Sequence, residues 1–188
     1  MTKFILHGGY TSTPSIHNTN FFKEMVKGLS EPVKILNVYF AAQKEKWQEL
    51  FEDDKKKFTE FNPGIQMEFI MASDDMDTLI GQIKSTDVVY IRGGRELLVY
   101  EIFKKIENLK ELFDGKVVGG SSAGAYVLSK YFYSNNRDEI MEGTGVLPVK
   151  CFAHYSDEKA DNLQMLKEYG EELEIYTIPD TEFVVIEK

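Results

Sequence analysis

Apolar residues along the chain fall into short runs that alternate with longer stretches of helical spacing. The short runs are rich in β-branched and aromatic residues, which favour strands. Seven such runs predict strands, at Lys3–His7, Val33–Phe40, Gln66–Ile70, Asp87–Ile91, Lys116–Gly119, Glu174–Ile178 and Phe183–Ile186.

The intervening segments place apolar residues on one helical face, as Phe21, Phe22 and Met25 do in the first of them. Helices are predicted at Thr19–Lys27, Lys44–Phe61, Asp77–Lys84, Glu96–Ile106, Ala123–Tyr131 and Asp157–Tyr169, with a loop over Ser134–Gly145. Alternating strands and crossover helices predict an α/β fold, a three-layer α/β/α sandwich with a mainly parallel, flavodoxin-like sheet. Without an internal repeat or a Pro/Gly/Ser-rich linker, residues 1–188 are expected to form a single domain.

Composition narrows the classes of ligand. The formal net charge is −9 and the pI is about 4.9, which argues against nucleic acid and anionic membrane surfaces as partners. No apolar run reaches the ~20 residues of a membrane helix. The first residues, MTKFILHGGY, turn polar too early for a signal peptide, so a cytoplasmic location is expected. A small ligand is the expected partner.

The chain offers little for metal or cofactor binding. Cys151 is the only cysteine, so neither an internal disulfide nor a thiolate-rich metal cluster is expected. The three histidines, His7, His17 and His154, do not have the spacing of metal ligands, and no motif indicates a cofactor.

Residues 117–126, VVGGSSAGAY, present a hydroxyl between small residues where a predicted strand meets a helix. This pattern fits a nucleophile elbow, in which a sharp turn brings backbones into contact and exposes the nucleophile. The register makes Ser122 the exposed hydroxyl and aims the N–H of Ala123 at a developing oxyanion. A Gly/Ser-rich turn that only caps the helix would look similar.

A serine hydroxyl is a poor nucleophile without a base, and the chain has three histidines that could supply one. His154 follows the elbow and precedes a predicted helix, in the Ser-then-His order of other α/β hydrolases. His7 ends the first strand and could face the same sheet edge, whereas His17 is interpreted as a surface residue.

The loop Arg92-Gly93-Gly94-Arg95 follows a middle strand, and its paired glycines leave backbone N–H groups unshielded. It offers a second oxyanion donor. The chain has only three arginines, and Arg92, Arg95 and Arg137 all fall in loops beside the predicted site. In an otherwise lysine-rich chain, this distribution indicates carboxylate recognition by guanidinium groups.

In this combination the chain resembles the dipeptidase E and cyanophycinase family of serine peptidases, whose fold is related to the class I glutamine amidotransferases. The resemblance covers most of the chain. It rests on the Gly-Gly loop, the elbow Gly120–Ala125, the segment Gly145–Val149 leading into His154-Tyr155, and the closing segment Ile178–Val185.

The resemblance implies hydrolysis of small peptides with Ser122 as nucleophile, His154 as general base, and the backbones of Gly93 and Ala123 as oxyanion donors. Gly94 and the three arginines would then contact substrate, and the arginines could give a preference for acidic residues. The chain departs from the family where Arg92 replaces a glycine and where Arg95-Glu96 replace Asn-Thr.

The family places an acid shortly after the elbow helix, and Asp138 is the predicted third member of the triad. Asn136, Glu139 and Glu142 are alternatives at nearby positions. A carboxylate suits the role because it orients the imidazole and compensates its charge.

Two other functions and a homodimer are considered for this sequence. A glutaminase-like site would use an elbow cysteine, yet Cys151 lies far from the elbow in sequence. A member without its third residue would bind a peptide or amino acid without turnover. The aromatic stripe Trp47, Phe51, Phe58 and Phe61 is interpreted as core, and part of it could serve a homodimer interface.

Overall fold

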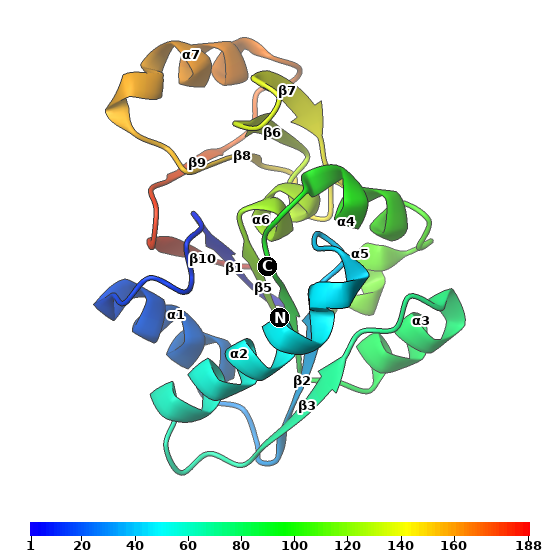
Figure 1. Ribbon diagram of the computed structural model, residues 1–188. Helices are drawn as coiled ribbons and strands as arrows, with labels where there is room; N and C mark the ends of the chain where they lie inside the picture. The colour runs from blue at the N-terminus through cyan, green and yellow to red at the C-terminus, as the bar shows by residue number, and fades with distance from the viewer.

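The computed structural model describes all 188 residues and contains two β-sheets (Figure 1). The larger sheet has the strand order β10-β1-β5-β4-β2-β3, and every neighbouring pair is parallel except β10 and β1. Its strands are β1 (Lys3–His7), β2 (Val33–Val38), β3 (Met67–Met71), β4 (Val88–Ile91), β5 (Val117–Ser121) and β10 (Phe183–Glu187).

Helices cover both faces of this sheet, which confirms the predicted α/β layering. Alternate residues of each strand point to opposite faces. In β1, Leu6 joins the buried cluster beneath α3, α4 and α6, whereas Ile5 joins the cluster beneath α1 and α2. The helices are α1 (Ile16–Val26), α2 (Trp47–Phe61), α3 (Met76–Lys84), α4 (Glu96–Phe103), α5 (Leu109–Leu112), α6 (Ala123–Leu128) and α7 (Ala160–Glu168), with 3₁₀ turns at Lys44–Lys46 and Asp157–Lys159.

The second sheet was not predicted. It has the order β7-β6-β8-β9 and lies with α7 at the top of Figure 1. Its strands are β6 (Tyr131–Ser134), β7 (Glu139–Glu142), β8 (Lys150–Ala153) and β9 (Ile175–Ile178). The larger buried cluster contains residues of both sheets, including Leu36 from β2 and Cys151 from β8.

The predicted helix Ala123–Tyr131 is wrong at its end, and the predicted loop Ser134–Gly145 contains a strand. Helix α6 stops at Leu128 because Ser129 is extended, with a ψ of 166°. Residues Tyr131–Ser134 then pair with Glu139–Glu142 as antiparallel strands. Four consecutive buried residues show no period that separates strand from helix, so only the pairing decides.

Parallel pairing of β8 with β9 brings two distant segments to one edge. Ala153 lies opposite Ile178, so the residues just after each strand emerge side by side. The ends of β8 and β9 meet the end of β1, since His154 N–H donates to Gly8 O at 3.0 Å and Thr181 N–H donates to Gly9 O at 3.0 Å.

Candidate active site

Ser122 lies on a strained turn between β5 and α6. Its φ of 50° and ψ of −110° are rarely adopted by a residue with a side chain. Small neighbours permit this turn, because a Cβ on Gly124 would lie 2.1 Å from Ile91 O and one on Gly120 would lie 2.5 Å from Gly124 O. Ser122 N–H donates to His7 O at 2.9 Å, which ties the turn to β1. The local geometry is that of a nucleophile elbow.

His154 contacts the serine hydroxyl directly. Its Nε2 lies 2.9 Å from Ser122 Oγ, although the two residues come from different sheets. Tyr10 packs edge-on against the imidazole, with ring centroids 5.3 Å apart. His154 itself has a φ of 56°, and its backbone bond to Gly8 fixes this turn after β8. The structure therefore brings together the predicted serine and histidine.

Asp180, rather than Asp138, lies against the other side of the imidazole. The distance from His154 Nδ1 to Asp180 Oδ1 is 2.6 Å. Asp138 points elsewhere, because its carboxylate accepts hydrogen bonds from the Tyr133 hydroxyl and from Asn162 Nδ2. This corrects the expected partner of His154. The reason is topological, since the unpredicted β7 carries the segment around Asp138 away from the end of β8.

The alternatives to Asp138 are also engaged elsewhere. Asn136 Nδ2 donates to the buried Glu96 at 3.1 Å, and Glu139 accepts from Arg137 Nε at 2.6 Å. Glu142 is exposed on β7 and pairs with Tyr131 across the strands. Of these residues only Asn136 lines the cavity around Ser122.

Two backbone N–H groups lie beside Ser122 without a partner of their own. Ala123 is the first residue of α6, so its N–H has no intrahelical acceptor. Gly93 lies in the loop after β4, and its N–H donates to no acceptor in the chain. A Cβ on Gly93 would lie 3.0 Å from Ser122 Cβ, so the loop backbone touches the elbow. Both groups match the predicted oxyanion donors in position.

The three arginines differ in how they are engaged. Arg92 forms an ion pair with Asp54 at 2.6 Å, and only 15% of its side chain is exposed. Arg137 pairs with Glu139, whereas Arg95 is exposed and forms no ion pair. Arg95 and Arg137 line a groove of about 880 Å³ that shares Gly94 and Asn136 with the cavity around Ser122.

The cavity around Ser122 has a volume of about 500 Å³. This is within the range of small-molecule sites. It is lined by the loop after β1, the loop after β4, the elbow, Asn136 and His154. Ser122 and His154 therefore face a cavity that is large enough for a small molecule.

The model of peptidase family S51 matches residues 4–188. The chain belongs to peptidase family S51. This is the family of dipeptidase E and cyanophycinase, so the resemblance read from the motifs is confirmed, and with it the class of serine peptidase.

Solved structures show the same fold as this S51 chain. A crystal structure described as a "Putative Peptidase E Protein" from Listeria monocytogenes EGD-e aligns with a TM-score of 0.67 and 18% identity, covering 99% of this chain and 94% of that one. A peptidase from an acI-B1 Actinobacterium aligns with a TM-score of 0.67 and 17% identity, covering 99% of this chain and 83% of that one. A comparison with curated proteins gives no match.

The imidazole of His7 does not bind the Ser122 hydroxyl, although His7 ends β1 at the same edge and its carbonyl accepts from Ser122 N–H. It is fully buried, and its Nε2 lies 2.8 Å from Asn18 Oδ1. Its Nδ1 accepts from Gly9 N–H at 3.0 Å. His17 is exposed on α1, as expected. Burial lowers the pKa of His7 to about 4, so it supports the loop after β1 in its neutral form.

Asp180 was the residue that sequence reasoning missed. It stands two residues after β9, in the turn Pro179–Glu182 that leads into β10. An acid just past the carboxyl end of a strand is a usable signal, because chemistry in open α/β sheets gathers at such ends. Applying it required the parallel pairing of β8 and β9, which the sequence did not reveal.

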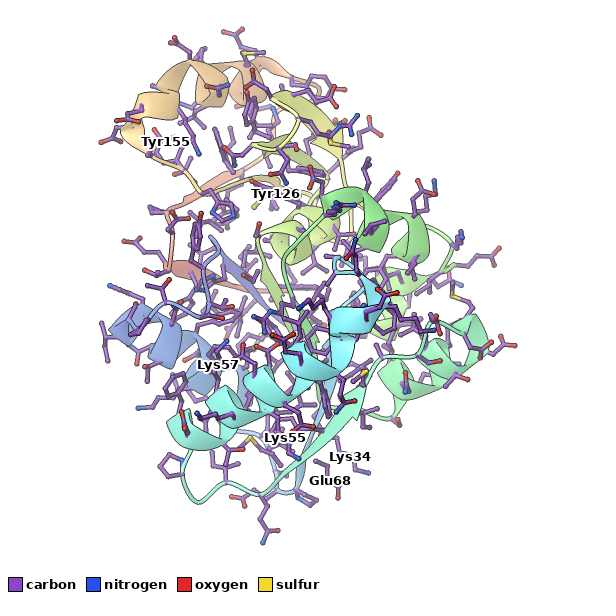
Figure 2. All side chains as sticks on the ribbon, in the orientation of Figure 1. Lys34, Lys55, Lys57, Glu68, Tyr126 and Tyr155 are labelled. Carbon is purple, nitrogen blue, oxygen red and sulfur yellow. The ribbon has the colours of Figure 1, made fainter.

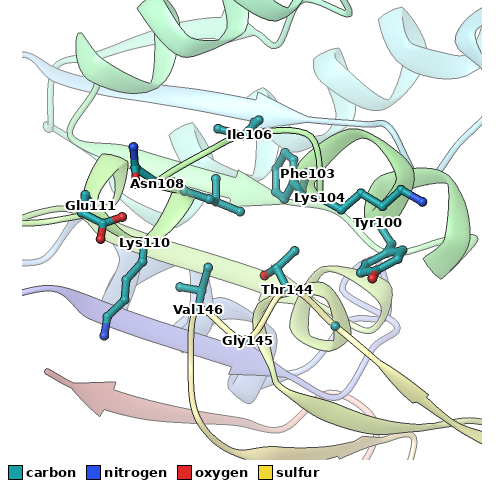
Figure 3. A pocket seen from close by; sticks show the side chains of 12 residues that line it. Tyr100, Phe103, Lys104, Ile106, Asn108, Lys110, Glu111, Thr144, Gly145 and Val146 are labelled. Carbon is teal, nitrogen blue, oxygen red and sulfur yellow. The ribbon is translucent and has the colours of Figure 1, made fainter.

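A second cavity of about 420 Å³ lies between the α4–α5 connection and the segment Gly143–Val146 (Figure 3). Phe103 and Ile106 contribute apolar surface to it, and none of its lining residues belongs to the site around Ser122.

No helix is both long and apolar enough to cross a membrane. No group of three His, Cys, Asp or Glu side chains is arranged to hold a metal ion.

Proposed function

We propose that this S51 chain hydrolyses short peptides, with Ser122 as nucleophile, His154 as general base and Asp180 as the residue that orients the imidazole. One observation carries the proposal. The continuous contacts from Ser122 Oγ to His154 Nε2 at 2.9 Å and from His154 Nδ1 to Asp180 Oδ1 at 2.6 Å form the arrangement that activates a serine.

The contacts define the proton path. Asp180 accepts a hydrogen bond from Nδ1–H, which keeps the proton on Nδ1 and leaves the Nε2 lone pair directed at the Ser122 hydroxyl. As Oγ bonds to the peptide carbonyl carbon, its proton moves to Nε2, and the carbonyl oxygen becomes an anion facing the N–H groups of Gly93 and Ala123. Nε2–H then protonates the departing nitrogen, the C–N bond breaks, and an acyl-enzyme remains.

Water completes the reaction by the reverse proton path. His154 removes a proton from water, the hydroxide oxygen bonds to the acyl carbon, and the proton returns to Ser122 Oγ as the acid is released. The half-exposed position of Asp180, whose side chain is 51% exposed, keeps the third member accessible to solvent. Asp138 has no part in this scheme.

We further propose that the substrates carry a carboxylate that Arg95 binds, with Arg137 beside it. Arg95 is an exposed guanidinium without an ion-pair partner, and it lines the groove that opens from the cavity of Ser122. Two observations support an acidic-residue preference, namely this position and the unpaired charge. Arg92 is left out because Asp54 and Asp53 already neutralise it.

Two alternative functions, a binding module without turnover and a glutaminase-like site, are not favoured by these contacts. The binding-module interpretation depended on a missing third residue, and the contact of Asp180 with His154 Nδ1 at 2.6 Å argues against that premise. A glutaminase-like site would need a reactive cysteine, but Cys151 is fully buried in β8, where burial raises the pKa of its thiol to about 12.

The experiment is a dipeptide panel that includes Asp-X and the matching Asn-X substrates, assayed with wild type and Ser122→Ala. A fluorophosphonate probe is added in parallel, and the labelled residue is located by mass spectrometry. We expect turnover and labelling in wild type, and loss of both in Ser122→Ala. Turnover that survives in Ser122→Ala would refute the nucleophile assignment.

Arg95→Gln tests the substrate preference separately. We expect the ratio of kcat/KM for Asp-X over Asn-X to fall about 10-fold or more, with Asn-X turnover little changed. An unchanged ratio would refute the role of Arg95 while leaving the serine mechanism intact.

A further inference from the structure

The guanidinium of Arg92 borders the site and is bound by three side chains of the same chain. Its Nη1 lies 2.6 Å from Asp54 Oδ1 and 3.1 Å from Asp53 Oδ2, and its Nη2 donates to Ser12 Oγ at 3.2 Å. Lys57, labelled on α2 in Figure 2, donates to Asp53 at 2.6 Å and to Ser12 at 2.8 Å. Two cations and two carboxylates leave this cluster with no net charge.

The two carboxylates differ sharply in burial. The side chain of Asp54 is 0% exposed, whereas that of Asp53 is 41% exposed. A buried charge pair interacts more strongly than a solvated one, and removing one partner leaves the other charge uncompensated. Asp54 contacts Arg92 through its Oδ1 atom, and its Oδ2 atom has no hydrogen-bond partner. Asp54 is therefore the main anchor of the guanidinium.

This anchor acts on the loop that borders the elbow. Arg92 N–H donates to Val38 O at 3.0 Å, and Arg95 N–H donates to Ala41 O at 2.8 Å. Between these two bonds, the N–H groups of Gly93 and Gly94 donate to no acceptor in the chain. Arg92 directly precedes Gly93 in the chain, and its side chain is bound to α2. The free N–H of Gly93 therefore lies next to a residue whose side chain is held in place.

We propose that Asp54 is a positioning residue which, through Arg92, holds the Gly93 N–H where the oxyanion forms. The proposal rests on the proposed function. An oxyanion donor must be fixed before reaction, because the charge that it stabilises exists only in the transition state and the intermediate. Loss of the anchor should therefore lower kcat more than it raises KM.

The test compares Asp54→Asn with Asp53→Asn, using the dipeptide that wild type cleaves best. Asp54→Asn keeps the side-chain size and removes the buried charge that faces Arg92. We expect kcat to fall about 10-fold or more, somewhat less than the ~10²–10³ measured when a donor is deleted outright. KM should stay within about 3-fold. Asp53 contacts the same guanidinium from an exposed position, and we expect Asp53→Asn to lower kcat by at most about 3-fold.

Two further measurements separate positioning from folding. Circular dichroism melting shows whether Asp54→Asn is folded at the assay temperature, and the pH dependence of kcat should be unchanged because His154 and Asp180 are untouched. Arg92→Lys keeps the charge but cannot contact the carboxylates and Ser12 through two separate nitrogens, as Nη1 and Nη2 do, so it should fold and still lower kcat by several-fold. It carries the test if Asp54→Asn does not fold.

A folded Asp54→Asn or Arg92→Lys with the kcat of wild type overturns this proposal alone. An equal loss in Asp54→Asn and Asp53→Asn also overturns it, because burial would then be irrelevant. Wild-type protein without turnover that depends on Ser122 overturns the proposed function, and this proposal with it.

Discussion

Lowering the pH from 7.5 to 4.5 should remove a stabilising contribution that comes from neutral His7. The Gly9 N–H donates to His7 Nδ1 at 3.0 Å, so the ring proton is on Nε2, which donates to Asn18 Oδ1 at 2.8 Å. Asn18 in turn donates to the carbonyls of Tyr10 and Thr13. A second ring proton on Nδ1 would face the Gly9 N–H and would break this network.

The direction and size of this change in stability follow from the pKa of His7. Burial lowers the pKa of His7 from 6.5 to about 4, so the folded state binds the second proton less readily than the unfolded chain. The contribution is fully present above pH 6.5 and is lost as the pH falls towards 4. At 1.36 kcal/mol per pKa unit, the loss in the free energy of unfolding approaches about 3 kcal/mol.

The assay is urea unfolding at pH 7.5, 6.5, 5.5 and 4.5 for wild type and His7→Gln, with His17→Gln as a control at an exposed histidine. His7→Gln should be less stable than wild type at pH 7.5, because its side chain cannot reproduce both ring contacts. The difference between wild type and His7→Gln should shrink by about 2–3 kcal/mol on going to pH 4.5. Groups that titrate equally in both proteins cancel in this difference.

A difference that stays constant within about 0.5 kcal/mol over this pH range would refute the reasoning, since His7 would then titrate alike in both states. The same change in His17→Gln would also refute it, because the effect would not depend on burial.

Three further predictions concern the site and the only thiol. Asp180→Asn should lower kcat/KM about 100-fold or more because the imidazole loses its orienting carboxylate, whereas Asp138→Asn should stay within about 3-fold; equal losses would contradict the contacts seen here. Gly9→Ala should lower kcat/KM at least about 10-fold, since its Cβ would lie 2.0 Å from His154 Cε1. Gly64→Ala, also at positive φ but with open space around it, is the control and should affect stability only. Burial raises the pKa of Cys151 to about 12, so a thiol reagent at pH 8 should modify it only as the chain unfolds; rapid native labelling would argue against that burial.

Local patterns in the sequence were sufficient to predict much of the fold and part of the site. Strand β1 was predicted with the bounds that the structure has, and β2–β5 were predicted to within a few residues. The central strands β4 and β5 are buried at every position, so each appears in the sequence as a short run of apolar or small residues, and the elbow at Ser122 depends on small residues that adjoin it in sequence. His154 was predicted because it follows the elbow and precedes a predicted helix, in the Ser-then-His order of other α/β hydrolases.

The remaining features depend on pairing between distant segments. Tyr131–Ser134 becomes a strand because it pairs with Glu139–Glu142 on one side and with β8 on the other, since its own residues suit a helix as well. Arg92 looked free to bind substrate until α2 brought Asp53 and Asp54 to it from nearly forty positions away in the chain. Asp180 reaches His154 only through the parallel pairing of β8 and β9.

The sequence by itself thus predicted the layered sheet, the turn that exposes Ser122 and the histidine that faces it, because neighbouring residues dictate backbone conformation and burial. Only the tertiary structure decided which carboxylate faces the histidine and which arginine remains unpaired. Those choices are set by strand register and helix packing, and no local pattern of residues encodes either one.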